Sequence, residues 1–209
     1  MEVPSGSVLD LANRIMKKSP ELLDLFTAET EQEFEVAFDK WLERAIIGLE
    51  TNKLNFQEMK EVGLTGALAL ALNMPGIDVH QEPNSNGHVD LLIEVWLGVR
   101  TWRKLGEAKV YDGPDYHIEG LKQLLGRYTT GRETRGVLIE YVTKANIAAL
   151  MKKVRDRMDE LLPESQTGAC ADHSLKWSFL SKHNHSCGEN LEVGHIGCNL
   201  FVSDSKVAQ

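Results

Sequence analysis

The apolar residues in the first part of the chain recur at helical spacing. Between residues 30 and 49 they are three or four positions apart, at Phe34, Phe38, Trp41, Leu42, Ala45 and Leu49. This period predicts an amphipathic helix with one buried face. We expect a shorter helix before it over residues 7–18, ended by Ser19-Pro20, and a third helix over residues 56–72, capped by Asn55.

From residue 77 the pattern changes to short runs rich in Val, Leu and Ile, which is typical of strands. We expect strands at residues 77–81, 88–96, 102–111, 136–142, 175–182 and 191–202, helices at residues 115–128 and 144–162, and a mobile loop at residues 163–173. Helices followed by strands with helices between them indicate an α/β protein, a mixed β-sheet flanked by helices with an N-terminal helical extension. We therefore divide the chain into a helical region, residues 1–52, and a core, residues 53–209.

The composition is that of a globular protein and excludes several other classes. Of the 209 residues, 42% are hydrophobic and 26% are charged, which excludes a collagen or a disordered chain. Three cysteines are too few for a disulfide scaffold. The longest apolar stretch, Leu64–Met74, is too short to span a bilayer, and we identify no signal peptide. We expect a reduced, cytoplasmic protein without a membrane partner.

The charge is unevenly distributed along the chain. The net charge of −8 by itself argues against binding to nucleic acid. Residues 100–157, however, contain thirteen Lys and Arg against seven Asp and Glu, a net charge of +6 that leaves −14 on the remainder. Two interpretations stay open for this segment: a basic face that contacts phosphates, or ordinary solvated helix and strand surfaces.

The spacing of two predicted strands brings charged residues opposite each other. A two-residue hairpin turn at residues 98–99, with Gly at its first position, pairs Glu94 with Arg103. This is a favourable cross-strand charge pair. The same register places Asp90 opposite Glu107, and a longer loop would shift both pairs.

Two acids side by side repel each other unless a cation lies between them. Lys109 is two positions after Glu107, and so on the same face of the strand, but it only partly compensates this repulsion. Mg²⁺ prefers oxygen ligands and usually needs one or two protein carboxylates, and a nearby lysine can orient or deprotonate a metal-bound water. Asp90, Glu107 and Lys109 therefore indicate metal-dependent hydrolysis of a phosphodiester bond.

The segment Gly87-His-Val-Asp90, followed after sixteen residues by Glu107-Ala-Lys109, resembles the active-site signature of the PD-(D/E)xK nuclease superfamily. The resemblance implies a restriction-endonuclease-like fold, in which the Asp, the Glu and the carbonyl between Glu and Lys bind Mg²⁺, with Mn²⁺ as a substitute. These groups would be Asp90, Glu107 and the carbonyl of Ala108, with Lys109 positioning or activating water. The Pro that usually precedes the Asp is Val89 here, a departure that many active members tolerate.

The same resemblance assigns two further residues. Gln123 begins a helix segment, Gln123-Leu-Leu-Gly-Arg-Tyr128, that resembles a motif of several branches of the superfamily, in which the Gln lies beside the active site. Many members also use a Glu from a helix before the Asp strand as a metal ligand. Glu61 is the best match for this residue, and Glu58 is the alternative.

The C-terminal part contains a second group of chemically active residues. Their types suit zinc, and they are Cys170, His173, His183, His185, Cys187, His195 and Cys198. Their spacing is not that of a familiar zinc finger or ribbon, and no Cys-x-x-Cys pair occurs. We therefore interpret most of them as strand and loop residues, and keep a zinc-stabilised interaction protein as a third hypothesis.

These observations favour a magnesium-dependent nuclease that acts on DNA. The alternative is a catalytically inactive nucleic-acid-binding or assembly module on the same fold, which the net charge and the short chain favour. One active site cuts one strand at a time, so we expect a homodimer or larger assembly, with the acidic helices of residues 7–50 at the contact. By analogy with restriction and anti-phage defence nucleases, we expect a protein partner to supply targeting or activation.

Overall fold

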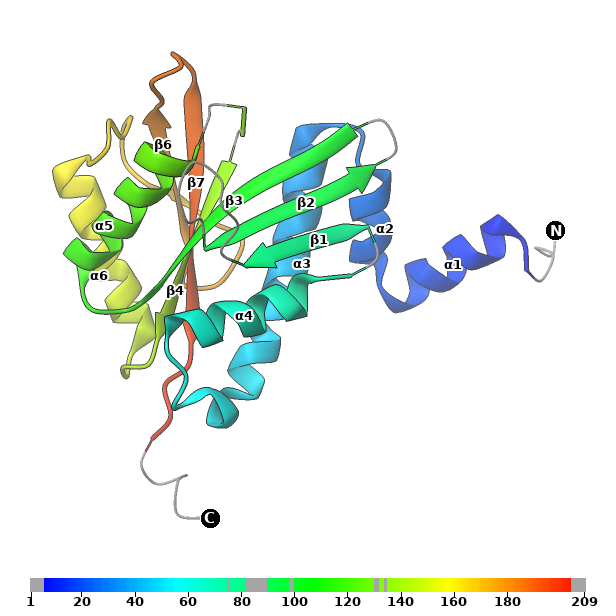
Figure 1. The fold of residues 1–209 in the computed structure, drawn as a ribbon, viewed down its shortest axis with the longest axis horizontal. Helices are drawn as coiled ribbons and strands as arrows, with labels where there is room; N and C mark the ends of the chain where they lie inside the picture. Colours follow the sequence, from blue (N-terminus) through cyan, green and yellow to red (C-terminus); the bar gives the residue numbers. More distant parts are fainter. Residues whose placement is uncertain are drawn as a thin grey trace. The chain divides into compact units, whose positions relative to one another are not determined.

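The first of two compact units is helical. The structure, a computed structural model, describes residues 6–74, 76–81, 90–97, 100–129, 132–133 and 135–203. The boundary between the two units lies between Ala45 and Ile46. The first unit contains α1 (Val8–Lys18), α2 (Pro20–Thr27) and the beginning of α3 (Glu31–Thr51) (Figure 1).

The helices predicted over residues 7–18 and 30–49 are confirmed, but α2 was not predicted from the sequence. We expected Ser19-Pro20 only to end the preceding helix. Pro20 instead begins α2, at a position where the missing N–H removes no intrahelical hydrogen bond.

The second unit is built on one mixed sheet. Its elements are the end of α3, a 3₁₀ turn (Lys53–Phe56), α4 (Glu61–Leu72), β1 (Ile77–Gln81), β2 (Leu91–Leu97), β3 (Arg100–Val110), α5 (Pro114–Gln123), a π-helical turn (Leu124–Tyr128), β4 (Arg135–Val142), α6 (Ile147–Leu161), β5 (Ala171–Asp172), β6 (Phe179–Asn184) and β7 (Asn190–Asn199). The predicted α/β class is therefore confirmed.

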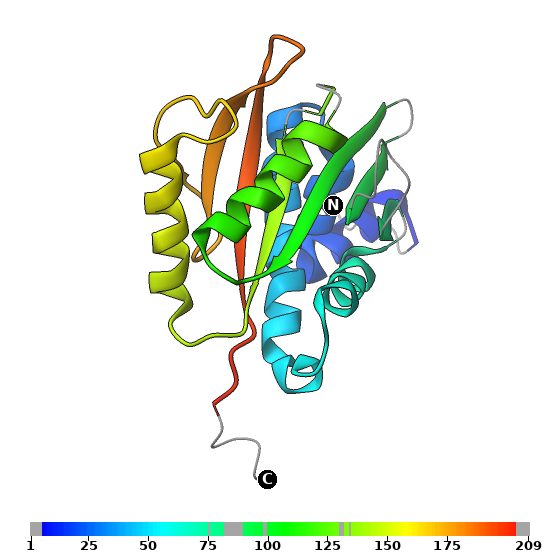
Figure 2. The same ribbon diagram turned by 60° about the vertical axis from the view of Figure 1, so that its left-hand side comes forward.

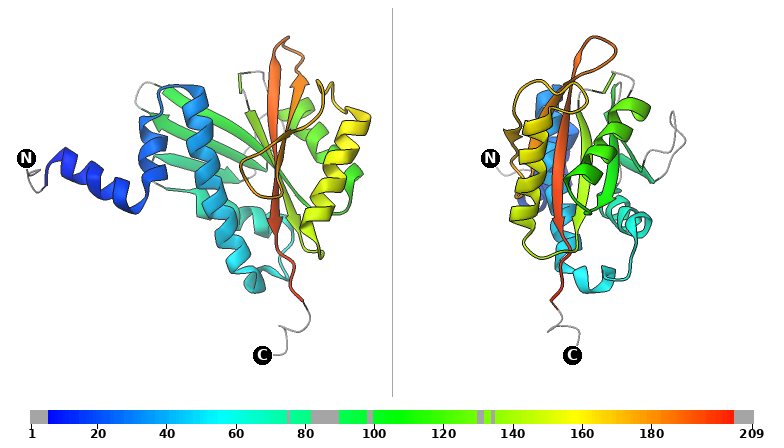
Figure 3. Two further views of the ribbon diagram at one scale, coloured as in Figure 1. Left: turned by 180° about the vertical axis from the view of Figure 1, so that it is seen from behind. Right: turned by 90° about the vertical axis from the view of Figure 1, so that its left-hand side faces the viewer.

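The described strands follow the order β1-β2-β3-β4-β7-β6-β5, which can be traced in Figure 1 and from behind in Figure 3. The pairs β3–β4 and β4–β7 are parallel, and the other pairs are antiparallel. The parallel connection from β3 to β4 runs through α5, as such crossovers require.

Two helices, α5 and α6, cover one face of the sheet (Figure 2). Leu105 and Leu138 of the sheet share a buried apolar core with Leu121 of α5 and Met151 of α6. Complete burial of such side chains contributes about 1.5–3 kcal/mol each to folding. Helix α4 contacts β1 and β3.

Several predicted boundaries differ from the structure. The third helix begins at Glu61 and not at residue 56, because residues 53–56 form a 3₁₀ turn. The helix expected to end at residue 128 is α-helical only to Gln123, and the next turn widens so that the N–H of Thr129 bonds to the carbonyl of Leu124. The expected loop at residues 163–173 contains β5.

The C-terminus of α6 generates a prediction about stability. Leu162 caps α6 in the left-handed conformation, with φ 46°, where a Cβ costs roughly 1–2 kcal/mol. Leu162→Gly should raise the free energy of unfolding by about 1 kcal/mol, because glycine adopts this conformation without strain. Leu161→Gly, one residue earlier in the helix, should lower it by about 1 kcal/mol. Urea unfolding of the two variants would test this, and equal effects would contradict it.

Candidate active site

The register of β2 and β3 is the one that the sequence predicted. Leu91 pairs with Gly106 and Glu94 pairs with Arg103. The turn expected at residues 98–99 lies outside the described residues, as does the Gly87-His-Val segment of the signature. Asp90 immediately precedes β2, so the same register carries it to the level of Glu107.

Beyond Gly106, strand β3 continues without β2 beside it. Its last ladder partner on that edge is at Gly106, so among the described residues no strand lies beside the N–H groups of Ala108 and Val110 there. Two carboxylates take the place of the missing strand. Asp90 Oδ2 accepts from the N–H of Ala108 at 2.9 Å, and Glu61 Oε2 accepts from the N–H of Val110 at 3.0 Å. These two backbone N–H groups thus hold both carboxylates at this edge of β3.

The carbonyl of Ala108 belongs to the same edge. In an antiparallel ladder a residue's N–H and C=O face the same neighbour. Because the N–H of Ala108 bonds to Asp90, its carbonyl is directed to the side that β2 has left.

Glu107 and Lys109 form a buried ion pair on the face of β3 that α5 covers. Lys109 Nζ lies 2.6 Å from Glu107 Oε1 and 3.7 Å from Glu61 Oε1. Only 1% of Glu107 and 7% of Lys109 is exposed. Gly120 of α5 makes this possible, since a Cβ there would lie 3.1 Å from Lys109 Cγ. The lysine stem therefore lies against the helix backbone.

The electrostatics of this group are unusual. The pKa of Glu107 is raised to about 7, mainly by burial and also by the charges of Asp90 and Glu61, against the opposing effect of Lys109. Burial alone would lower the pKa of Lys109, but its hydrogen bond to Glu107 and the surrounding acids outweigh this and raise it. Lys109 is therefore an ammonium at neutral pH. A carboxylic acid with a pKa near 7 is typical of functional sites.

The donor chemistry fits a hard divalent cation. Glu107 Oε2 is buried and has no hydrogen-bond partner in the part of the chain that the structure describes, and such an atom is costly unless another group binds it. Asp90, Glu61 and the carbonyl of Ala108 supply further oxygens, the ligand type that Mg²⁺ prefers. These side chains are not yet close enough together to hold a metal ion, however. In the described part of the chain no three His, Cys, Asp or Glu side chains are gathered at metal-binding distance.

No bond in the described part of the chain links the other predicted site residues to this group. Gln123 is the last residue of α5, and within the described ranges no hydrogen bond or ion pair joins it to the cluster. Glu58, the alternative to Glu61, is exposed in the turn before α4 and makes no such bond either. Glu61 is therefore the better of the two assignments.

Much of the basic segment is neutralised by nearby acids. Lys144 pairs with Asp112, Lys152 with Asp156, Arg155 with Asp172, and Arg157 with Asp115 and Glu160. Lys104 and Arg135 are buried. The interpretation as ordinary solvated surface therefore holds for these paired residues.

The histidines and cysteines of the C-terminal part do not converge on one point. Within the described residues none of them belongs to a metal-binding group. Cys170 and Cys198 are buried, Cys187 is exposed, and all three are free thiols. His183, which we expected in a loop, is a buried residue of β6.

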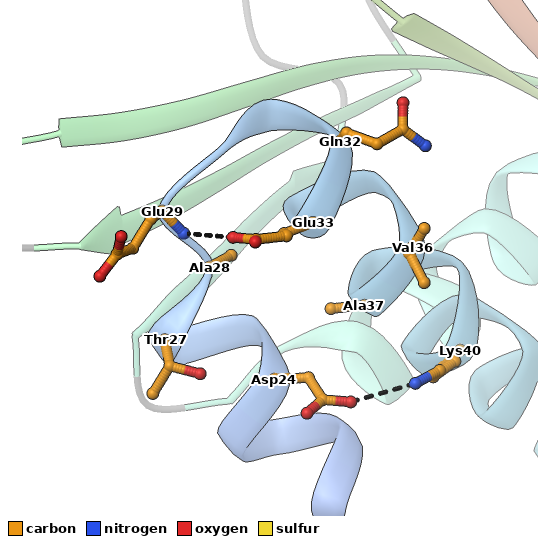
Figure 4. A pocket seen from close by; sticks show the side chains of 9 residues that line it. All are labelled: Asp24, Thr27, Ala28, Glu29, Gln32, Glu33, Val36, Ala37 and Lys40. Carbon is orange, nitrogen blue, oxygen red and sulfur yellow. Dashed lines mark hydrogen bonds and ion pairs between the residues drawn. The ribbon is translucent and has the colours of Figure 1, made fainter.

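A cavity of about 430 Å³ lies in the first unit, against α2 and α3 (Figure 4). Its charged groups are used by local structure. Asp24 pairs with Lys40 at 3.0 Å, and Glu33 accepts from the N–H groups of Glu29 and Thr30 at the start of α3. This cavity brings no nucleophile or base to a reacting position, and we do not assign the active site to it.

Comparisons of the chain with protein-family models, with curated proteins and with solved structures found no match. Among the described residues, no helix is both long and apolar enough to cross a membrane.

The raised pKa of Glu107 predicts a pH-dependent stability. Its folded pKa of about 7 exceeds the ordinary 4.5, so the protonated acid stabilises the folded state below pH 4.5 and this contribution is lost as the pH rises to 7. Relative to Glu107→Gln, the wild type should lose up to about 3 kcal/mol between pH 4.5 and 8. Urea unfolding in EDTA would measure it. Glu119→Gln on α5 is the exposed control, and an identical slope for wild type and Glu107→Gln would contradict the prediction.

Proposed function

We propose that the chain is a metal-dependent nuclease that hydrolyses phosphodiester bonds in DNA, on the restriction-endonuclease-like fold of the PD-(D/E)xK superfamily. One observation carries the proposal: Asp90, Glu107 and Lys109 come together where β3 extends past β2. Glu61, from the helix before these strands, joins them. The mixed sheet and the order of helices and strands agree with this fold.

The oxygens of Asp90, Glu107, Glu61 and the carbonyl of Ala108 would hold the Mg²⁺, and Mn²⁺ would substitute for it. The bound cation would lower the pKa of a water molecule and offset charge on the phosphate oxygens. Glu107 supplies a partnerless oxygen for this role. Asp90 and Glu61, which accept from backbone N–H groups, are held in place by β3.

Lys109 would act on substrate as a cation. Its ammonium can donate a hydrogen bond to the attacking water, or to a non-bridging phosphate oxygen, and so orient the two for reaction. Glu107 at 2.6 Å and the backbone of α5 at Gly120 restrict where this group can point. Gln123 remains a candidate for a substrate contact at the end of the same helix.

The size of the chain determines how many copies a double-strand break would need. One copy has one site and would cut one strand, so we propose that a homodimer or larger assembly makes double-strand breaks. The helices of residues 7–50 are the proposed contact, since Val8, Leu9 and Leu11 of α1 are more than half exposed. Targeting or activation by a partner protein, as in restriction and anti-phage defence, remains an analogy.

A second candidate function has specific support. Asp90 and Glu61 already accept hydrogen bonds, and no ready-made metal group is present among the described residues. A catalytically inactive module that binds nucleic acid or assembles with partners on the same fold would have these properties. The two candidates differ in whether Mg²⁺ binds at Glu107.

Cleavage assays would test the nuclease directly. Supercoiled plasmid, linear duplex and single-stranded DNA would be incubated with Mg²⁺, Mn²⁺ or EDTA. Glu107→Ala and Lys109→Ala should each lower the rate at least about 100-fold, because the first removes a proposed Mg²⁺ ligand and the second removes the cation that would orient the water or the phosphate. Lys122→Ala, an exposed residue of the last turn of α5, is the matched control and should cut at the wild-type rate.

Calorimetry would separate the two candidates if no cleavage is seen. Mg²⁺ binding by the wild type but not by Glu107→Ala would support a nuclease that awaits a partner. Absence of Mg²⁺ binding even with DNA present would contradict the nuclease and leave the inactive module.

A further inference from the structure

Helix α1 has an apolar face that is largely open in the described part of the chain. Its apolar side chains recur three or four positions apart, at Val8, Leu11, Ala12, Ile15 and Met16. No residue of α1 is buried, and 85% of Val8, 59% of Leu11 and 54% of Met16 is exposed. Isolated helices shorter than about 12–15 residues are marginal in water, and α1 has 11 residues. We therefore expect a second surface to cover this face.

The cavity against α2 and α3 in the same unit has the properties of such a surface (Figure 4). Ala28, Val36 and Ala37 line it with apolar side chains, and 48% of Val36 is exposed. Its volume is about 430 Å³. A cavity of about 150 Å³ holds a benzene molecule, so this one has room for two or three side chains of that size.

The charged groups around the cavity are bonded within the unit. Asp24 pairs with Lys40 at 3.0 Å. The carboxylate of Glu33 accepts from the N–H groups of Glu29 and Thr30 at the start of α3. A strongly polar ligand would have to displace these bonds. The cavity still offers apolar surface, which favours a set of apolar side chains as its occupant.

The two surfaces carry opposite charge. Helix α1 contains Arg14, Lys17 and Lys18 against Asp10, a net charge of +2. Residues 19–45, which form α2 and the beginning of α3, contain eight Asp and Glu against two Lys and Arg, a net charge of −6. Complementary charges of this kind favour encounter and orient the partners more than they add affinity.

The connection between the helices prevents α1 from covering the cavity of its own chain. The cavity is lined by the second half of α2, so α1 would reach it only by running back along α2. Two antiparallel helices need a loop of about 2–5 residues, and only Ser19 separates Lys18 from Pro20. Helix α1 instead continues away from the start of α2 (Figures 1 and 3). An α1 that enters the cavity therefore comes from another copy.

We propose that two copies of the chain exchange α1, so that the apolar face of each α1 packs into the cavity against α2 and α3 of the other copy. This specifies the contact of the homodimer proposed above and rests on that part of the proposed function. A two-fold dimer uses the same pair of surfaces twice. The exchange therefore covers both apolar faces and both cavities.

One charge on either surface tests the exchange. Light scattering during size-exclusion chromatography of the full chain, over a series of concentrations, should show a wild-type dimer. Leu11→Glu on α1 and Val36→Glu in the cavity should each raise the Kd of the dimer about 100-fold or more. A buried, unpaired carboxylate costs at least about tenfold in affinity, and each change occurs twice in the dimer. Leu70→Glu on α4 is the matched control, since 80% of Leu70 is exposed, and it should leave the dimer intact.

A mixture of the two variants tests whether the helices are exchanged. Leu11→Glu keeps a native cavity and Val36→Glu keeps a native α1. A mixed pair thus contains one contact with both native surfaces, which neither variant forms alone. The mixture should contain a dimer at concentrations at which each variant alone is a monomer. Circular dichroism would verify that the variants fold, as expected for substitutions at exposed positions.

Several results would overturn the exchange. These are a wild type that is monomeric throughout the series, a dimer that survives Leu11→Glu or Val36→Glu, a dimer that Leu70→Glu dissociates, or a mixture without dimer. A monomer that binds vesicles of anionic phospholipid, and loses this binding in Leu11→Glu, would assign α1 to a lipid surface instead.

Failure of the exchange and failure of the nuclease give different results. A wild type that forms the exchanged dimer but neither cuts DNA nor binds Mg²⁺ supports the exchange and contradicts the nuclease. A monomer that nicks DNA with Mg²⁺ contradicts the exchange and supports the nuclease.

Discussion

The extension of β3 beyond β2 is the constraint on which the candidate site depends. It leaves the N–H groups of Ala108 and Val110 without a strand partner on one edge. A buried donor without an acceptor costs about 1–3 kcal/mol, and the carboxylates of Asp90 and Glu61 remove this cost. The geometry of the backbone therefore gathers two acids beside Glu107 before any ligand is considered. If β2 extended as far as β3, the N–H groups of Ala108 and Val110 would bond to β2. Asp90 and Glu61 would then have no backbone donors at this position.

The acids gathered in this way make the metal-free site electrostatically unfavourable. Glu107 is buried, close to two other carboxylates, and Lys109 is the cation that pairs with it. Glu107 therefore holds its proton up to a pH near 7, unlike a solvated glutamate. Structures keep such arrangements at functional sites at the expense of stability. The raised pKa of Glu107 thus supports the proposed cation site over a purely structural ion pair.

The parts of the fold that follow from local rules could be predicted from the sequence. The period of two in β2 and β3 and a short turn fixed the register that places Asp90 level with Glu107. Local sequence signals did not predict the helix boundaries correctly where the same residue type occurs in two kinds of structure. Pro20 can end one helix or begin the next, and Asn55 can cap a helix or lie in a 3₁₀ turn. The closeness of Glu61 depends on how α4 lies against β3, and the sequence supports it only by resemblance.

Glu140, His117, His195, Ser181 and His183 form a buried chain of hydrogen bonds that could not be predicted from the sequence, for a physical reason. His117 and His195 are 78 positions apart and meet only because α5 packs on the sheet, which brings His117 to the side chain of His195 in β7. Metal-ligand residue types therefore suggested zinc, where the structure forms hydrogen bonds. One local signal was available: Glu140 is a charged residue within the apolar strand Arg135–Val142. A buried acid in a strand covered by helices needs a partner from another element, and sequence spacing alone does not identify that partner.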